Sequence, residues 1–111
     1  LFIDKPLAGS LRDVIKIFQL ARQFKVPVFT SSSLRFYPGV IDVKKADYGE
    51  LRGVISTGPC SLEPHHPDLF WYGIHPTESL FTVMGTGCES VVRTSTKDTD
   101  VATGVWSGGR V

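Results

Sequence analysis

Two residues of this 111-residue chain combine a side chain suited to acid-base chemistry with a sequence context that could use it. Lys5 follows the apolar run 1–3, which predicts a buried strand, so Lys5 is expected at the carboxyl end of that strand. Ligands of open α/β sheets bind at this edge. His75 lies at the mouth of a predicted helix, among aromatic residues and a glycine, and imidazole titrates near neutral pH. The alternatives are a solvated surface lysine and a hydrogen-bonded structural histidine.

Three other groups of residues are weaker candidates for a metal, dinucleotide or catalytic site. His65 and His66 are adjacent and have no third ligand at a metal-binding spacing, so we expect no metal site. The segment 85–90 resembles the start of a dinucleotide fingerprint, but it follows a predicted helix instead of a strand, and we interpret it as a helix end and a turn. The serines 31–33 lack the context of a nucleophile elbow. The sequence therefore gives little support to a hydrolase.

The elements that would position Lys5 form a strand, a helix and a second strand. Apolar residues recur at helical spacing over 11–24, and Ser10 can cap that helix. The wide apolar arc predicts that the helix is covered on more than one side. A short strand is predicted over 26–30. This order predicts a βαβ unit with two parallel strands.

The rest of the chain has a different pattern. It predicts a helix over 39–47, a strand over 51–57, an irregular loop over 58–68, and a helix over 69–84 that ends at Gly85. Strands at 90–95 and 101–106 are joined by a polar turn and predict a hairpin. The predicted fold class is α/β passing into α+β: the end of a parallel unit, followed by part of a domain with a mostly antiparallel sheet.

The composition excludes several classes of partner. Twelve basic and eleven acidic residues give a net charge of +1, so we expect no nucleic acid partner. No apolar run approaches the roughly 20 residues of a membrane-spanning helix, and a signal peptide is not evident. Cys60 and Cys88 are expected to be reduced thiols. A chain of this size can bury roughly 65% of its extended surface. These properties predict a cytoplasmic protein with one core.

Five motifs, in order, resemble the Gfo/Idh/MocA family, which includes glucose-fructose oxidoreductase and inositol dehydrogenase. The apolar run and Asp4-Lys5-Pro6 resemble that family's strand and its D/E-K-P motif, and the helix from Leu11 follows as it does there. The segment 34–38 resembles the family's R-F-x-P segment, and 49–54 resembles its G-x-I/L-x-G turn. The segment 73–78 resembles its G-V/I-H-x-x-D/E motif. The resemblance covers nearly the whole chain.

The resemblance implies a piece of a two-domain enzyme that binds NAD or NADP. Residues 1–30 would end a Rossmann-like dinucleotide-binding domain, and 31–111 would start a C-terminal domain that shapes the substrate site and forms a homo-oligomer through its sheet. Lys5 and Pro6 would lie near the nicotinamide, and Lys5 would bind the substrate hydroxyl. His75 would exchange the hydroxyl proton. A carbohydrate-like substrate would contact the side chains of Arg35, Trp71 and Tyr72.

One position departs from the family pattern. Many of its dehydrogenases have Asp four residues before the motif His, where this chain has Trp71, so Asp68 and Glu78 are the candidate substitutes. The leading hypothesis is an NAD(P)-dependent oxidoreductase for a sugar- or polyol-like alcohol or ketone. Alternatives are an NAD-dependent glycosidase-like relative, a non-catalytic carbohydrate-binding or assembly protein, and a small α+β domain without an active site. Because the glycine fingerprint is absent from these residues, we expect the 111-residue piece alone to be inactive.

Overall fold

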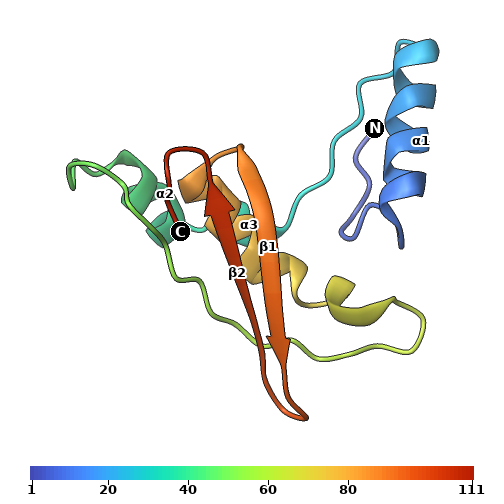
Figure 1. Cartoon of the computed structure of the whole chain (residues 1–111). Helices are drawn as coiled ribbons and strands as arrows, with labels where there is room; N and C mark the ends of the chain where they lie inside the picture. Colours follow the sequence, from blue (N-terminus) through green and yellow to red (C-terminus); the bar gives the residue numbers. More distant parts are fainter.

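Three α-helices, two 3-10 turns and one hairpin make up the chain, and the computed structural model describes all residues 1–111 (Figure 1). In chain order they are α1 (Leu11–Gln23), η1 (Ser33–Phe36), α2 (Pro38–Lys45), η2 (Asp68–Phe70), α3 (Ile74–Met84), β1 (Cys88–Ser95) and β2 (Asp100–Trp106). The strands form a two-stranded antiparallel sheet. The architecture is therefore α+β. No helix has the length and apolar character needed to cross a membrane.

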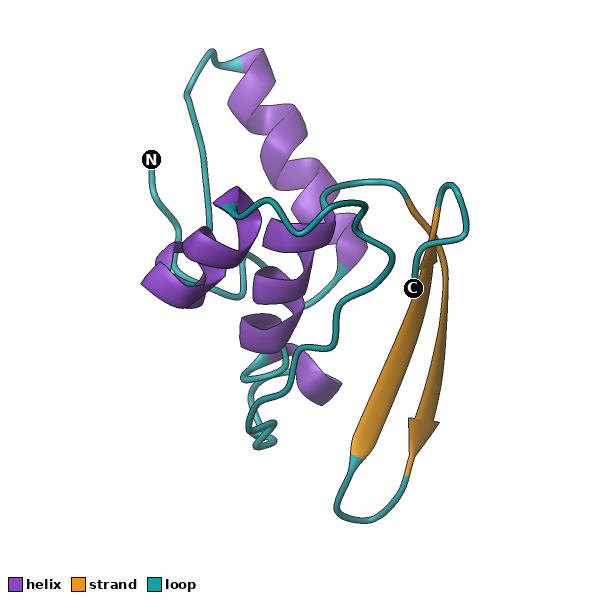
Figure 2. Ribbon diagram, turned by 90° about the vertical axis from the view of Figure 1, so that its left-hand side faces the viewer, coloured by secondary structure: helices purple, strands orange, loops and turns teal.

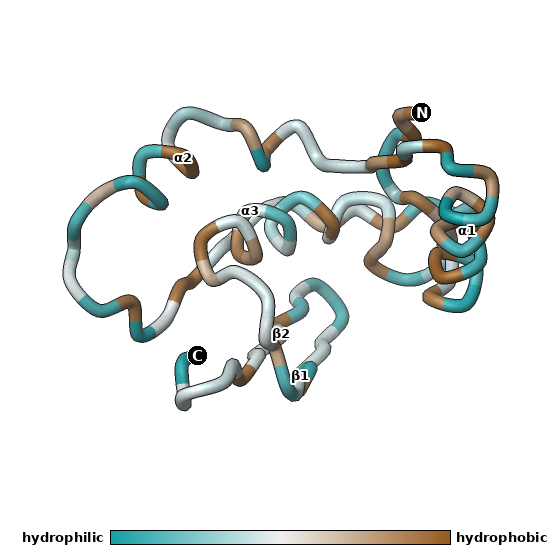
Figure 3. The backbone as a smooth tube through the Cα atoms, turned by 90° about the horizontal axis from the view of Figure 1, so that it is seen from above, coloured by the Kyte–Doolittle hydropathy of each residue, from teal (hydrophilic) through white to brown (hydrophobic).

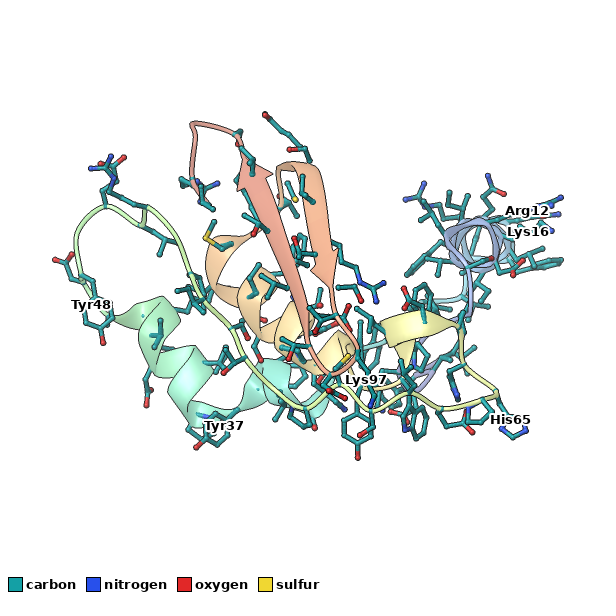
Figure 4. All side chains as sticks on the ribbon, turned by 60° about the horizontal axis from the view of Figure 1, so that its bottom comes forward. Arg12, Lys16, Tyr37, Tyr48, His65 and Lys97 are labelled. Carbon is teal, nitrogen blue, oxygen red and sulfur yellow. The ribbon has the colours of Figure 1, made fainter.

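Helix α1 begins where the sequence predicts it. The Ser10 hydroxyl accepts a hydrogen bond from the Asp13 N–H at 3.1 Å, and it donates to the Asp13 carboxylate at 2.8 Å, which caps the first turn. The expectation that α1 is covered on more than one side is wrong, because none of its residues is buried. Arg12 and Lys16 extend away from the rest of the molecule (Figure 4). The hydropathy colours show that α1 carries both apolar and polar residues (Figure 3), and none of them is buried.

The segments on either side of α1 pair in parallel, as predicted. The Ile3 N–H donates to Phe29 O, and the Phe29 N–H donates to Leu1 O, each at 3.1 Å. The Phe2 and Phe29 rings lie 5.0 Å apart. The pairing is a single bridge and not the two predicted strands 1–3 and 26–30, and the only sheet of the chain is the hairpin. The carboxyl ends of both segments still leave the bridge in the same direction.

Helix α3 begins later than the predicted 69–84 helix. Its first turn contains Pro76, which has no N–H to donate and is tolerated there but not in a helix interior. Residues 68–70 instead form η2, and the Gly73 N–H donates to Leu69 O at 2.8 Å. The helix ends at Gly85, as predicted, with φ +76° and a hydrogen bond from its N–H to Phe81 O. Helix α2 matches the predicted 39–47 helix within two residues.

The C-terminal hairpin confirms the predicted antiparallel pair. Strands β1 and β2 run side by side away from the helices (Figure 2), and Trp106 at the end of β2 anchors them. Its side chain is 3% exposed, its ring lies 5.1 Å from the Phe81 ring, and its Nε1–H donates to Gly85 O at 3.0 Å. Trp106 therefore joins the hairpin to the end of α3.

The predicted strand 51–57 is wrong. That segment makes only two strand-like hydrogen bonds, from the Val54 N–H to Val111 O and from the Val111 N–H to Arg52 O, so a single residue is its partner.

The core is smaller than the chain length predicts: Ser32, Thr82, Met84 and Trp106 are the buried residues. The radius of gyration of 15.3 Å exceeds the roughly 13 Å of a compact domain of this length. Helix α1 lies apart from α2, α3 and the hairpin (Figure 1).

Candidate functional site

The parallel bridge places Lys5 and the serines 31–33 at one edge of the N-terminal segment. Lys5 follows the first bridged segment, and the serines follow the second. Because paired parallel segments end on the same side, both groups emerge there together. The start of α3 lies against this edge, since Ser32 contacts His75 and Lys5 contacts Trp71. The edge that the sequence indicates for ligand chemistry therefore meets the first turn of α3.

The Lys5 side chain is held by two aromatic residues. Its Nζ donates a hydrogen bond to Trp71 O at 3.1 Å, and the same atom lies 4.2 Å from the centre of the Trp71 ring and 5.4 Å from that of Tyr72. These distances are typical of cation–π contacts. Lys5 is half-buried and forms no ion pair, so two of its three N–H groups have no protein acceptor. Lys5 is thus a positioned cation, unlike a freely solvated surface lysine.

His75 lies beside the same aromatic residues. Its ring centre is 5.5 Å from that of Tyr72, and its Nδ1 is 2.6 Å from the Ser32 hydroxyl. Burial lowers the pKa of His75 below its usual value, and the positive charge of Lys5 lowers it further, against smaller opposing effects of Asp4 and Glu78. No protein group bonds Nε2. His75 therefore has one ring nitrogen fixed by the protein and the other available to a ligand.

Neither of the two carboxylates that could have replaced the family's Asp forms a hydrogen bond with His75. Glu78 pairs with Arg35 at 3.4 Å, and Asp68 pairs with Arg93, which also contacts Asp100. Arg35 extends from η1 to α3 through this pair and does not contact Lys5 or Trp71 through any hydrogen bond. The partner of His75 is instead Ser32, which the sequence analysis did not identify. Its only sequence signal is the serine run that precedes η1.

A cavity of about 330 Å³ opens beside His75. Its lining includes Tyr72 and His75, Leu34 of η1, and the segment 57–59. Tyr72 contacts Lys5 as well, so it is shared by the cavity and the lysine site. Lys5, Trp71, Pro6 and Arg35 do not line this cavity. The structure thus brings Lys5, Trp71, Tyr72 and His75 together and leaves Arg35 at the edge, in its pair with Glu78.

The remaining polar groups do not join this site. The Nδ1 atoms of His65 and His66 both contact the Glu63 carboxylate, at 2.7 and 2.8 Å, and these hydrogen bonds lower the pKa of Glu63. His65 extends outward from its loop (Figure 4). No cluster of three His, Cys, Asp or Glu side chains suited to a metal ion forms in the structure. Cys60 and Cys88 are free thiols, and burial, followed by the charge of Asp100, raises the pKa of Cys60.

Comparisons with known proteins leave the family resemblance untested. No protein-family model matches the chain, and neither a curated protein nor a solved structure matches it significantly.

Proposed function

We propose that this chain forms the substrate-binding side of an NAD(P)-dependent oxidoreductase of the Gfo/Idh/MocA type, acting on a sugar- or polyol-like alcohol or ketone. One observation carries the proposal. Lys5 lies 66 residues before Trp71 in the sequence, yet its ammonium group lies on Trp71 and Tyr72, next to His75. A cation and an imidazole with a free nitrogen in one half-buried place are the groups that a reacting hydroxyl or carbonyl oxygen requires.

The residues present fit the reacting end of the cofactor and substrate. Two N–H groups of Lys5 and Nε2 of His75 have no protein partner, so this donor set can meet an oxygen ligand. The residues present do not fit the pyrophosphate of the cofactor. Its glycine-rich site needs a turn between a strand and a helix, and Gly85 and Gly87 lie between α3 and β1. When bound, the nicotinamide supplies or accepts the hydride. We assign the pyrophosphate site to chain outside these residues.

Lys5 and His75 are proposed to bind the reacting oxygen between them. The positive charge of Lys5 stabilises the negative charge that develops on this oxygen, and the proton of this oxygen is exchanged within the Lys5–His75 pair. Pro6, next to Lys5, is proposed to face the nicotinamide. Trp71 and Tyr72 are proposed to pack on the apolar face of a sugar ring, and Arg35 to contact its outer hydroxyl groups.

The finer fold assignment is part of the same proposal. The parallel bridge around α1 supports the end of a Rossmann-like domain over 1–30, and the antiparallel hairpin supports the start of a second domain over 31–111. Homo-oligomer formation through the hairpin sheet and a cytoplasmic location stay predictions.

The test is turnover by the intact protein with NAD or NADP and a panel of polyols, sugars and their ketones, followed by the absorbance of the reduced nicotinamide. Replacing Lys5 or His75 by Ala should lower kcat/KM by about 100-fold or more with little change in folding. Lys16→Ala and His65→Ala, at exposed positions outside the site, are matched controls. Unchanged turnover in both site variants would refute the assigned roles. Sugar binding without turnover in the wild type would favour the binding-protein alternative.

A further inference from the structure

Ser32 is the one residue of the chain whose side chain is completely buried, and its hydrogen bonds determine how His75 can act. Ser32 is 0% exposed, and its Oγ has two partners: the Leu34 N–H at 3.1 Å and His75 Nδ1 at 2.6 Å. Because no solvent reaches Ser32, it cannot act as a nucleophile on an external substrate. Its hydroxyl must therefore satisfy its hydrogen-bonding needs within these two contacts.

Counting donors assigns the direction of the Ser32–His75 hydrogen bond. The Leu34 contact uses Oγ as an acceptor, since a backbone N–H can only donate. The Ser32 hydroxyl hydrogen then has a single acceptor within reach, the lone pair of Nδ1. If Nδ1 carried a hydrogen, Oγ would accept twice, and its own buried hydrogen would have no partner. An unsatisfied buried donor is costly, so the first arrangement is favoured.

We propose that Ser32 is a positioning residue that donates to Nδ1 of His75 and thereby presents a neutral imidazole, with its hydrogen on Nε2, to an acceptor oxygen of the substrate. The identity of that oxygen rests on the proposed function, and the hydrogen-bond direction does not. An Nε2–H donor binds a carbonyl oxygen well and cannot remove a hydroxyl proton. The site is thus built to take a ketone substrate and to polarise its carbonyl group.

This assignment gives Lys5 and His75 different roles. Neutral His75 donates a hydrogen bond to the oxygen and keeps its own proton. The proton that the oxygen acquires comes from an N–H bond of the Lys5 ammonium group, and the resulting amine regains a proton from water. This chain has Trp71 four residues before His75, and the protein group that orients the His75 ring is the Ser32 hydroxyl.

The charged groups around His75 agree with a neutral ring. Lys5 faces it from the N-terminal segment and opposes a second positive charge, while Asp4 on that segment and Glu78 on α3 act in the other direction. Glu78 is paired with Arg35, and Tyr72 presents a ring edge that carries no charge. Burial is the largest influence, and it also favours the uncharged imidazole.

The direct test is an NMR measurement of the His75 ring nitrogens in the intact protein labelled with ¹⁵N-histidine. His75→Gln assigns the signals by removing them. Above the pKa of His75, we expect an unprotonated Nδ1 and a protonated Nε2. A ring protonated at Nδ1 overturns the proposal.

The variant test uses the sign of a pKa change. Ser32→Ala removes the donor to the neutral ring, so the pKa of His75 should rise, and Ser32→Thr, which keeps the hydroxyl, should restore it. If Ser32 instead accepted a hydrogen from Nδ1, its removal would lower the pKa, which contradicts the proposal. Ser31→Ala is the matched control, because the Ser31 hydroxyl bonds only Ser32 O. We expect kcat/KM for a ketone to fall about fivefold in Ser32→Ala.

The two proposals can fail separately. If the Nε2–H form is found and no ketone or alcohol is turned over, the oxidoreductase proposal fails and the role of Ser32 stands. If turnover is found with Nδ1 protonated, the oxidoreductase proposal stands and the role of Ser32 is wrong.

Discussion

Replacing Trp71 by Leu should release Lys5 from its fixed position without removing its charge. The substitution keeps the backbone carbonyl that accepts from Nζ at 3.1 Å and removes the ring whose centre lies 4.2 Å from that atom. A cation–π contact contributes about 0.5–2 kcal/mol, depending on desolvation. Since both residues are half-buried, we take about 1 kcal/mol, which corresponds to about a fivefold smaller population of the positioned lysine. We expect kcat/KM to fall by about this factor.

The assay is a double-mutant cycle with Lys5→Met, read by NMR titration of His75 as well as by kinetics. Lys5→Met should raise the pKa of His75, because it removes the nearby positive charge. Trp71→Leu should raise it less, and in the Lys5→Met background Trp71→Leu should add little. Additive effects of the two substitutions would refute the idea that Trp71 acts by holding Lys5. A loss in Trp71→Leu as large as that in Lys5→Ala would refute it as well.

Two further outcomes concern stability. Because the pKa of His75 is lowered in the folded protein, its contribution to stability is complete above the unfolded-state pKa of about 6.5 and is lost as the pH falls toward the folded-state pKa. His75→Gln should therefore remove part of the acid-side fall in Tm, and superimposable Tm–pH profiles would contradict this. Gly104→Ala should cost about 1–3 kcal/mol in the free energy of unfolding, because the added Cβ would lie 2.5 Å from the buried Trp106 ring. Denaturant unfolding measures it, with the exposed Thr103→Ala as control.

Local signals in the sequence predict the elements that depend on near neighbours. Ser10 and the apolar residues at helical spacing after it predict α1, and the polar turn between two segments rich in β-branched residues predicts the hairpin. The 51–57 strand fails because β-branched residues indicate an extended backbone but not whether a partner strand lies beside it. The apolar spacing predicts too early a start for α3, because this spacing extends back to residue 69. Pro76 is tolerated only in the first turn of a helix, so α3 begins at Ile74.

The sequence identifies some residues of the candidate site and not others. The resemblance carried by the order of the motifs implies that Lys5 and His75 lie at one place. Ser32 could not be predicted, because its role depends on a contact with a residue 43 positions away and on complete burial. Neither property has a signature within a run of three serines. The small core was also not predictable, since composition reports how much apolar surface a chain has but not which of it is covered.

The hydrogen bond from Lys5 to Trp71 is the only one that links the segment 1–30 to residues 33–111. Lys5 is therefore both the proposed oxygen-binding group and the side chain whose hydrogen bond joins two parts of the molecule. In the proposed function, a substrate oxygen that takes an N–H bond of Lys5 away from Trp71 O would break this hydrogen bond. Substrate binding would then also change how the segment 1–30 is attached to residues 33–111.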